Sequence, residues 1–421
     1  MRILHTSDWH LGKYLEGYSR LDEQEQMIGE MVDIVNRESV DLVLIAGDIY
    51  DTMNPPSRAE TLFYQGVKAL ADGGRRPVIV IAGNHDHPDR LQAAAHLAQD
   101  HGVLLMGMPD FMVPSGPFGQ HHLQVHGQGA VTLDIQGQKV VFNLLPYPSE
   151  KRLNQVLSES LDEADLQRSY SEKVQERFSQ MAVHFKEDTI NIAMSHLFTM
   201  GGETTDSERP IQIGGGLVVN ANAFPERSQY IALGHLHRAQ QVRGNEKAYY
   251  AGSPLQYSRS EVGYAKVVKI VDLEAGADAL VRDVYLTNYK PIETWTCHSV
   301  QEAIDRCEEN HDRPTWVYLE IHTDKVLDQE DIRAIKRAKK DLLGIQPILQ
   351  SDGDPALIQD HKIDEMTMAE LFTGFFKKEN GVAPTDQVAN IFNMLVGEEG
   401  QDEADQTDAE WLEQLYRGTD H

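Results

Sequence analysis

The sequence predicts an α/β protein whose main domain is a four-layer α/β/β/α sandwich. Over the first hundred residues, short apolar runs alternate with two stretches, residues 21–39 and 57–72, in which apolar side chains recur at helical spacing. This alternation is typical of parallel strands joined by helices. From about residue 103 to 150 the pattern changes to successive strands with a turn at Gln136 and Gly137, which indicates antiparallel pairing in a second sheet. Two sheets packed face to face, with helices outside, explain this order better than a single doubly wound sheet.

Composition and charge predict a globular protein and limit its partners. The chain has 421 residues and a formal net charge of −28, and its length predicts two or three domains. No apolar run reaches the roughly 18 residues of a membrane span, and the first residues form a strand pattern without a basic leader, so we expect a cytoplasmic protein without membrane contact. Cys297 and Cys307 fit neither a zinc motif nor a disulfide scaffold, so we expect free thiols. So acidic a chain repels a polyanion unless basic patches, bound cations or a partner intervene.

Five apolar runs share one design, because each ends in side chains that bind metal ions. In open α/β sheets, sites form beyond the carboxyl ends of the strands, so these ends can converge although they are far apart in the sequence. The third run leads directly into Gly83, Asn84, His85 and Asp86, which combine a sharp turn, a neutral oxygen and a proton donor or acceptor. The candidate ligands at the other four ends are Asp8 and His10, Asp48 and Asp51, His196, and His235 with His237.

This set of ligands predicts a site for two divalent ions that acts on phosphate esters. Carboxylate oxygens and imidazole nitrogens without sulfur suit ions such as Mn²⁺, and two ions about 4 Å apart need one bridging carboxylate. The amide oxygen of Asn84 keeps the site from becoming too negative to bind phosphate. Two such ions lower the pKa of a water molecule and stabilise negative charge on the phosphoryl oxygens.

The order of the motifs, D-x-H, G-D-x-x-D, G-N-H-D, H and G-H-x-H, resembles the calcineurin-like metallophosphoesterase superfamily. Their fuller forms, HTSDWHLG, AGDIYD, AGNHD, SHL, GHLH and AGSP, resemble the nucleases that repair DNA double-strand breaks, closely over about residues 1–265. The resemblance implies two divalent ions, with Mn²⁺ expected and Mg²⁺ as the alternative. It implies that the first ion is held by Asp8, His10, Asp48 and His237, and the second by Asp48, Asn84, His196 and His235.

The resemblance also assigns roles around the metals. It implies that His85, next to the ligand Asn84, is the general acid that protonates the leaving oxygen. Asp51 stands where some relatives carry a histidine thought to help place DNA; we do not transfer that role and expect Asp51 to orient a neighbouring histidine. For Asp86 we expect support of the loop, with direct contact to the substrate as the alternative.

Each motif by itself has a structural alternative. The D-x-H and G-D motifs also occur as turns or caps at strand ends, and alternate histidines such as His235 and His237 often lie at the rim of a sheet. His196 by itself is indistinguishable from a buried histidine bonded to backbone. The metal site is predicted because five spaced motifs coincide in one chain.

The expected domains are a nuclease domain over residues 1–287, a small α+β capping domain over 288–350, a linker over 351–365, a helical segment over 366–397 and an acidic tail over 398–421. The capping domain carries a basic cluster, which is either a solvated helix face or, as the resemblance implies for this domain, a DNA contact. Its members are Lys336, Arg337, Lys339 and Lys340.

The helical segment has apolar residues at helical spacing that need a partner to bury them. The resemblance implies that this partner is an ABC-type ATPase with a long coiled coil, and that two copies of the chain form a homodimer within a heterotetramer. The expected partner-binding residues are Leu371, Phe372, Phe375, Phe376, Ile391 and Phe392.

Together these features predict a metal-dependent DNA nuclease. The resemblance implies double-strand 3′ to 5′ exonuclease and single-strand or hairpin endonuclease activities, gated by ATP in the partner, in DNA repair, recombination and replication. One alternative is a phosphatase or small phosphodiesterase of the same superfamily, which leaves the capping domain and the partner helices unexplained. The other is a non-catalytic scaffold for the ATPase, which has no need of His85.

Overall fold

A computed structural model describes residues 1–149, 152, 163–208, 218–323 and 327–349, together with residues 372, 373, 376, 384 and 388. The chain forms two compact units, Met1–Gln350 and Ser351–His421. The predicted linker, the acidic tail and most of the helical segment lie outside the described residues, and so do Leu371, Phe375, Ile391 and Phe392. Phe372 and Phe376 are described, with ring centroids 5.7 Å apart. The partner-binding prediction stays a prediction.

The first sheet carries the N-terminal strand at its centre, in the order β18-β17-β1-β4-β5-β6. Strands β1, β4, β5 and β6 are parallel, whereas β17 and β18 come late in the chain and pair antiparallel beside β1. The predicted βαβαβ arrangement is confirmed, but β6, which we expected at the start of the second sheet, belongs to the first. The elements are β1 (Arg2–Thr6), α1 (Leu21–Arg37), β4 (Leu42–Ala46), α2 (Ser57–Ala71), β5 (Val78–Ile81), α3 (Pro88–Gln92), α4 (Ala95–Asp100), β6 (Val103–Met106), β17 (Val267–Asp272) and β18 (Leu280–Tyr285).

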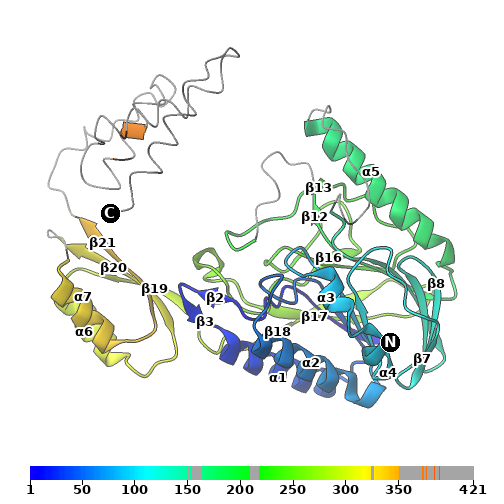
Figure 1. Ribbon diagram of the computed structural model, residues 1–421, viewed down its shortest axis with the longest axis horizontal. Helices are drawn as coiled ribbons and strands as arrows, with labels where there is room; N and C mark the ends of the chain where they lie inside the picture. The colour runs from blue at the N-terminus through cyan, green and yellow to red at the C-terminus, as the bar shows by residue number, and fades with distance from the viewer. Residues whose placement is uncertain are drawn as a thin grey trace, which may run out of the picture. The chain divides into compact units, whose positions relative to one another are not determined.

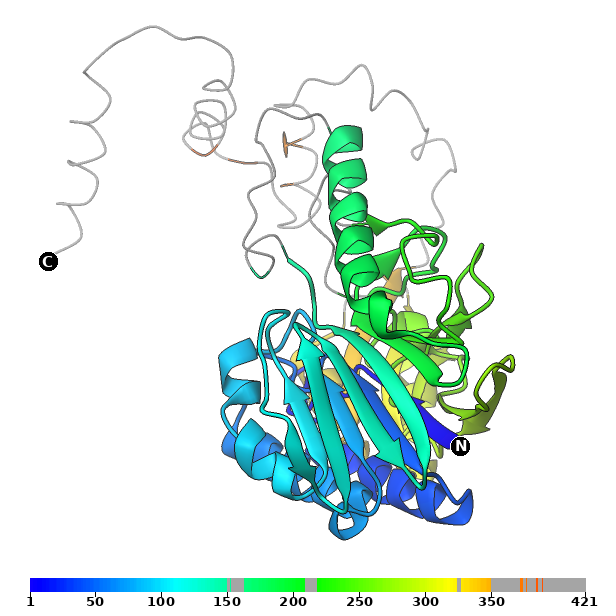
Figure 2. The ribbon, with the colours of Figure 1, turned by 90° about the vertical axis from the view of Figure 1, so that its right-hand side faces the viewer.

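The second sheet has the order β15-β16-β14-β11-β10-β9-β8-β7. Its strands β7 to β10 are antiparallel neighbours, seen side by side in teal in Figure 2. The predicted turn between β9 and β10 is confirmed, with Gln136 and Gly137 both left-handed at φ 53° and 79°, as a two-residue hairpin turn requires. The strands are β7 (Gly116–Phe118), β8 (His121–Gly127), β9 (Ala130–Ile135), β10 (Gln138–Leu145), β11 (Ile190–His196), β14 (Tyr230–Gly234), β15 (Gln240–Gln241) and β16 (Ala248–Tyr250).

The two sheets pack face to face between helices. Helices α1 and α2 lie outside the first sheet, and α5 (Glu163–Met181) lies outside the second (Figure 1). Helix α1 buries Met27 and Met31 in the main core, and α5 buries Val174 and Phe178 in a second apolar cluster. The predicted α/β sandwich is therefore confirmed. Shorter elements are β2 (Tyr14–Leu15), β3 (Tyr18–Ser19), β12 (Phe198–Thr199), β13 (Val218–Val219) and three 3₁₀ turns, Asp72–Gly74, Ala182–His184 and Arg259–Glu261.

A smaller domain of three strands and two helices follows, in the predicted strand–helix order. Its strands are all parallel, in the order β19-β20-β21, so both helices are crossover connections and our α+β assignment is wrong. The indole N–H of Trp316 in this domain donates to Glu23 Oε1 of α1 at 2.9 Å. Both cysteines are buried and free, as predicted. The elements are β19 (Ile292–Cys297), α6 (Val300–Glu309), β20 (Trp316–Thr323), α7 (Gln329–Ala338) and β21 (Leu342–Leu349).

The structure divides the predicted basic cluster of this domain. Lys336, Arg337 and Lys340 are exposed, but Lys339 is fully buried. Helix α7 ends at Ala338, and the extended backbone of Lys339 (φ −146°, ψ 130°) turns its side chain inward, where Nζ donates to the carbonyl oxygens of residues 310 and 313 at 3.1 and 2.9 Å. The prediction that Lys339 contacts DNA is therefore wrong.

Among the described helices, none has both the length and the apolar character that crossing a bilayer needs.

Candidate metal centre

The predicted strand ends meet between the two sheets. In the first sheet, the chain places Asp8 and His10 beyond β1, Asp48 beyond β4 and Asn84 beyond β5; in the second, His196 ends β11 and His235 follows β14. Three groups of side chains have ligand atoms within 4.8 Å of one another, and one of them is His10, Asp51 and His85. The other two, which contain the predicted ligands, are Asp8, His10 and His237, and Asp48, His196 and His235. All six of these side chains are buried.

Unusual backbone conformations at the strand ends orient these side chains. Asp8, His10 and Asp48 have left-handed φ angles of 54°, 45° and 48°, and His235 has a φ of 106°. Such conformations are costly for residues other than glycine and concentrate at functional sites. A Cβ on Gly83 would lie 2.1 Å from Asp48 Oδ1, so only glycine lets the third loop approach this carboxylate.

In the first group, two imidazoles face each other beside a carboxylate. His10 Nε2 and His237 Nε2 are 3.0 Å apart. The Asp8 carboxylate accepts the backbone N–H of His235 at 3.0 Å and the hydroxyl of Ser7 at 2.5 Å. Burial raises the pKa of Asp8 to about 6, and the nearby Asp48 carboxylate adds to this effect. Burial also lowers the pKa of His10 to about 3, so its imidazole is neutral and can offer a lone pair.

In the second group, Asp48 and Asn84 face two more imidazoles. His196 Nε2 lies 3.3 Å from Asp48 Oδ2 and 3.0 Å from Asn84 Oδ1, and His235 Nδ1 lies 3.1 Å from the same amide oxygen. Burial alone opposes charge on His196, but the Asp48 carboxylate raises its pKa to about 9. The same pairing holds the pKa of Asp48 well below its usual range in spite of burial. Burial lowers the pKa of His235 to about 3.

The geometry of both groups fits the binding of divalent cations. Asp48 Oδ2 lies 3.7 Å from His10 Nε2 and 3.3 Å from His196 Nε2, so this carboxylate stands between the two groups. Imidazole nitrogens and carboxylate oxygens converge at both places, with an amide oxygen at the second, and this mixture without sulfur suits divalent cations rather than soft ions such as Cu⁺.

His85 lies beside the two groups and is buried. Its ring Nδ1 donates to the backbone carbonyl of Asp51 at 2.7 Å, and its Nε2 lies 3.9 Å from Asp48 Oδ2. The side chain of Asp51 takes another direction, with Oδ1 3.5 Å from His10 Nδ1 and 2.9 Å from Lys13 Nζ. His10 Nδ1 makes no hydrogen bond to this carboxylate, and the orienting role of Asp51 stays a prediction.

Asp86 and Arg152 hold the loops that carry Asp48 and His85. Asp86 accepts the backbone N–H groups of residues 49, 50 and 83 at 3.1, 3.0 and 2.8 Å. Burial and the Asp48 carboxylate raise the pKa of Asp86. Arg152 donates to the carbonyls of Gly83 and Asp86, both at 2.8 Å. Sequence reasoning missed Arg152, because no motif surrounds it.

A second set of residues that sequence reasoning missed lies behind His237. Ser207 Oγ is 2.6 Å from His237 Nδ1, and Glu208 Oε1 accepts the backbone N–H of His237 at 2.8 Å. Glu261 is fully buried and forms an ion pair with Lys266. Although burial opposes it, Lys266 and His237 hold the pKa of Glu261 well below its usual range. The available signal was weak: two charged residues in a loop that follows the AGSP motif.

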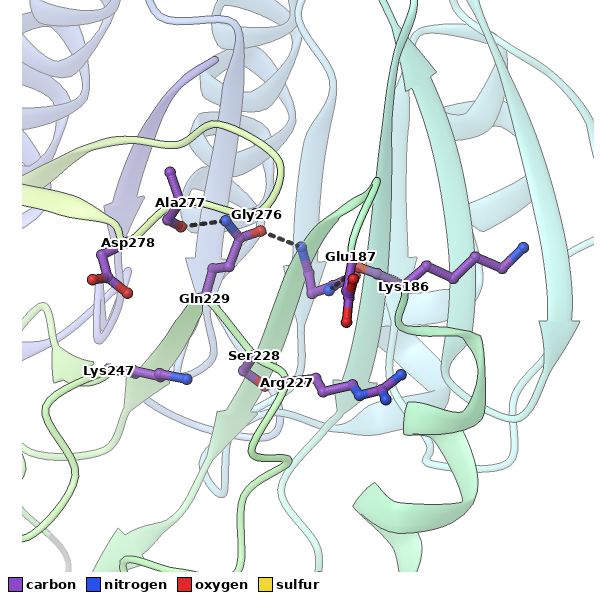
Figure 3. A pocket seen from close by; sticks show the side chains of 10 residues that line it. Lys186, Glu187, Arg227, Ser228, Gln229, Lys247, Gly276, Ala277 and Asp278 are labelled. Atoms are coloured by element: carbon purple, nitrogen blue, oxygen red, sulfur yellow. Dashed lines mark hydrogen bonds between the residues drawn. The ribbon is translucent and has the colours of Figure 1, made fainter.

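A separate hollow of 230 Å³ lies at the opposite ends of β11 and β14 from the ligand groups (Figure 3). At its base Gln229 donates to the carbonyl of Ala277 and accepts the backbone N–H of Asn191 at 3.1 Å. Its amide is thus occupied in joining the two strands to the loop before β18. The lining residues are Lys186, Glu187, Asn191, Arg227, Ser228, Gln229, Lys247, Gly276, Ala277 and Asp278.

Comparison with known proteins identifies the family to which the chain belongs. Residues 1–239 match the calcineurin-like phosphoesterase family, and the chain belongs to that family. Among curated relatives, the chain is similar to SbcD of the nuclease SbcCD from Bacillus subtilis (strain 168), with 40% identity over 398 residues that cover 94% of this chain and 97% of the relative. A solved dimetal phosphatase from Danio rerio aligns with a TM-score of 0.37 and 12% identity over 67% of this chain and 98% of that chain, a likeness too low to carry an argument. The predicted membership is confirmed.

Proposed function

We propose that this chain is a metal-dependent DNA nuclease and acts as the nuclease subunit of an SbcCD-type complex in the cytoplasm. One observation carries the proposal: two adjacent groups of buried aspartate and histidine ligands meet at the strand ends of this phosphoesterase fold. The similarity to a nuclease subunit, which extends over nearly the whole chain, supports a phosphodiester in DNA as the substrate rather than a small phosphomonoester.

The proposed ligands divide between two divalent ions, Mn²⁺ or alternatively Mg²⁺. When bound, such ions activate a water molecule and neutralise charge on a phosphodiester. The protein's own contribution is to hold the ligands in place. Asp48 stands between the two groups, and the left-handed backbone and buried hydrogen bonds fix the side chains on rigid strand ends. The proposed sets are Asp8, His10, Asp48 and His237 for one ion, and Asp48, Asn84, His196 and His235 for the other.

His85 is the proposed general acid. Because its Nδ1–H is donated to the carbonyl of Asp51, Nε2 is the nitrogen that faces the site. A proton held on Nε2 can pass to the leaving oxygen of the cut strand. Asp86 supports this function because its carboxylate accepts the backbone N–H of Gly83 and so holds the loop that carries His85.

A nuclease assay with Mn²⁺ tests this proposal through His85→Ala. Loss of a general acid typically costs 10²–10⁴-fold in rate, so we expect a loss of about this size in DNA cleavage. Mn²⁺ binding by calorimetry and DNA binding by fluorescence anisotropy should stay within about twofold, because His85 is not a proposed ligand. His87→Asn is the matched control on the same loop: His87 caps α3 by accepting the N–H of Arg90, and asparagine can replace that cap.

Two results would contradict the proposal. Full cleavage activity in His85→Ala would exclude the role of His85. Hydrolysis of small phosphomonoesters without any cutting of DNA by the unchanged chain would favour the phosphatase alternative.

The finer activities in the proposal rest on the family resemblance. They are 3′ to 5′ exonuclease activity on double strands and endonuclease activity on single strands and hairpins, gated by ATP in the ATPase SbcC. SbcC would bind the predicted residues of segment 366–397, in a heterotetramer with two copies of this chain. A chain that ends at residue 360 should keep Mn²⁺ binding and lose SbcC in size-exclusion chromatography; retained association would contradict this partner site.

A further inference from the structure

A chain of polar groups lies behind His237, on the side of the ring away from His10. His237 Nδ1 lies 2.6 Å from Ser207 Oγ, and Ser207 Oγ lies 2.5 Å from Glu261 Oε1. The other carboxylate oxygen of Glu261, Oε2, receives the ammonium of Lys266. His237, Glu261 and Lys266 are at most 8% exposed, whereas Ser207 between them is partly exposed.

Lys266 sets the direction of the hydrogen bonds along this chain. An ammonium can only donate, and the Glu261 carboxylate accepts from it and from the backbone N–H of Tyr257 at 3.1 Å. The carboxylate is a nearer and stronger acceptor than the Thr205 hydroxyl, which lies 2.9 Å from Ser207 Oγ, so the hydroxyl hydrogen of Ser207 points to Glu261. This leaves a lone pair of Ser207 Oγ facing His237. Nδ1 of His237 consequently carries the ring hydrogen. In a neutral imidazole, Nε2 then presents a lone pair.

That lone pair points into the candidate metal centre. His237 Nε2 is the atom that lies 3.0 Å from His10 Nε2. Lys266 is itself fixed, because Nζ also donates to Ser253 Oγ at 2.8 Å and to the carbonyl of His237 at 3.1 Å. The direction of the hydrogen bonds is thus anchored by backbone and by a buried charge.

We propose that Ser207, Glu261 and Lys266 are positioning residues that set the tautomer of His237 and so make Nε2 available as a metal ligand. The inference rests on the proposed function, since it concerns the same centre. Partners of this kind orient metal-binding histidines and raise their basicity. Behind His10 a carboxylate held by a lysine lies 3.5 Å from Nδ1, but Nδ1 itself makes no hydrogen bond there.

Glu261→Gln should reverse the direction of these hydrogen bonds with little change in the shape of the side chain. Lys266 keeps the amide oxygen on its own side, so the amino group takes the place of Oε1 and donates to Ser207, although it then also faces the backbone N–H of Tyr257. The Ser207 hydroxyl can then donate to His237 Nδ1, 2.6 Å away, or to Thr205 Oγ1, 2.9 Å away. The imidazole nitrogen is nearer and is the stronger acceptor, so we expect the ring hydrogen to move to Nε2. We expect Mn²⁺ affinity, measured by calorimetry, to fall about 10–100-fold, the usual effect of losing such a partner. Ser207→Ala should lose less, because Glu261 Oε1 lies 3.6 Å from Nδ1 and can replace the hydroxyl.

The tautomer is read directly by long-range ¹H–¹⁵N NMR on the metal-free full chain with labelled histidine, at alkaline pH. The signal of His237 is assigned by its absence in His237→Gln. The unchanged chain should show hydrogen on Nδ1, and Glu261→Gln should show it on Nε2. Glu203→Gln is the matched control, since Glu203 pairs with Arg238 and Arg243 rather than with His237, and it should change neither measurement.

The NMR result separates positioning from simple support of the fold. Hydrogen on Nε2 in the unchanged chain would overturn the inference even if every variant failed to fold. Weaker Mn²⁺ binding in Glu261→Gln with the hydrogen still on Nδ1 would also overturn it. If the chain binds Mn²⁺ and shows the expected tautomers but cuts no DNA, the proposed nuclease function fails while this inference stands.

Discussion

Replacing Asp86 by asparagine should disconnect the two loops that follow β4 and β5. Asp86 Oδ2 accepts the N–H groups of Ile49 and Gly83 at 3.1 and 2.8 Å, and Oδ1 accepts that of Tyr50 at 3.0 Å. Asparagine has one carbonyl oxygen, so if it serves Ile49 and Gly83, its amino group faces the N–H of Tyr50. Losing one charge-assisted bond costs about 1.5–3 kcal/mol and leaving a buried donor unpaired about 1–3 kcal/mol. The free energy of unfolding should therefore fall by about 2.5–6 kcal/mol.

Denaturant unfolding in EDTA measures this loss without a contribution from bound metal. Nuclease activity at a temperature where the variant is folded should also fall, because the loop that carries His85 is no longer held. Asp89→Asn is the control: Asp89 is exposed in the first turn of α3, three residues further along the chain, and accepts from the Gln92 side chain at 3.2 Å. Its change should stay within about 0.5 kcal/mol. An equal effect of the two substitutions would refute the reasoning.

Two further predictions concern pH and DNA binding. Burial, with the nearby charge of Lys269, lowers the pKa of His5 from 6.5 to about 3, so between these values the unfolded chain binds a proton that the folded chain does not. Stability should therefore fall as the pH drops through this window, by up to about 1.4 kcal/mol per pH unit. His5→Gln should show a shallower slope between pH 7 and 5, and an identical slope would count against this explanation. In the capping domain, charge reversal at the exposed basic residues should weaken DNA binding and reduce its salt dependence in anisotropy titrations, whereas Lys339→Met should lower stability instead; unchanged affinity and salt dependence after the reversal would exclude the DNA contact. The residues to reverse are Lys336, Arg337 and Lys340.

Sequence periodicity predicted which segments are strands and helices, but not always which strands are neighbours. The apolar runs around β1, β4 and β5 are hydrophobic on both faces, as strands between a layer of helices and a second sheet must be. The same pattern does not show that β17 pairs with β1, because the partner of a strand from late in the chain is chosen by tertiary packing. In the small domain, by contrast, strands alternate with helices, which is typical of parallel strands, and the α+β assignment was wrong because it did not apply this rule.

The candidate ligands were predictable because each directly follows a buried strand. The residues that hold the ligands in place were not predictable. Arg152, Ser207 and Glu261 come close to the site only through tertiary contacts. For Lys339 the prediction failed in the opposite way, because it assigned a DNA contact that the structure excludes. A basic residue at a helix end looks exposed in the sequence, but a change to extended backbone after Ala338 buries it.

The position of β1 between β4 and β17 has a consequence for synthesis. At about 5–20 residues per second, β17 leaves the ribosome roughly 10–50 s after β1. Until then one edge of β1 is unpaired, and for most of this interval His235 and His237 have not been made. A nascent chain therefore cannot assemble both ligand groups. The order in which the chain supplies its strands thus delays the assembly of the centre until well over half of the protein has been made.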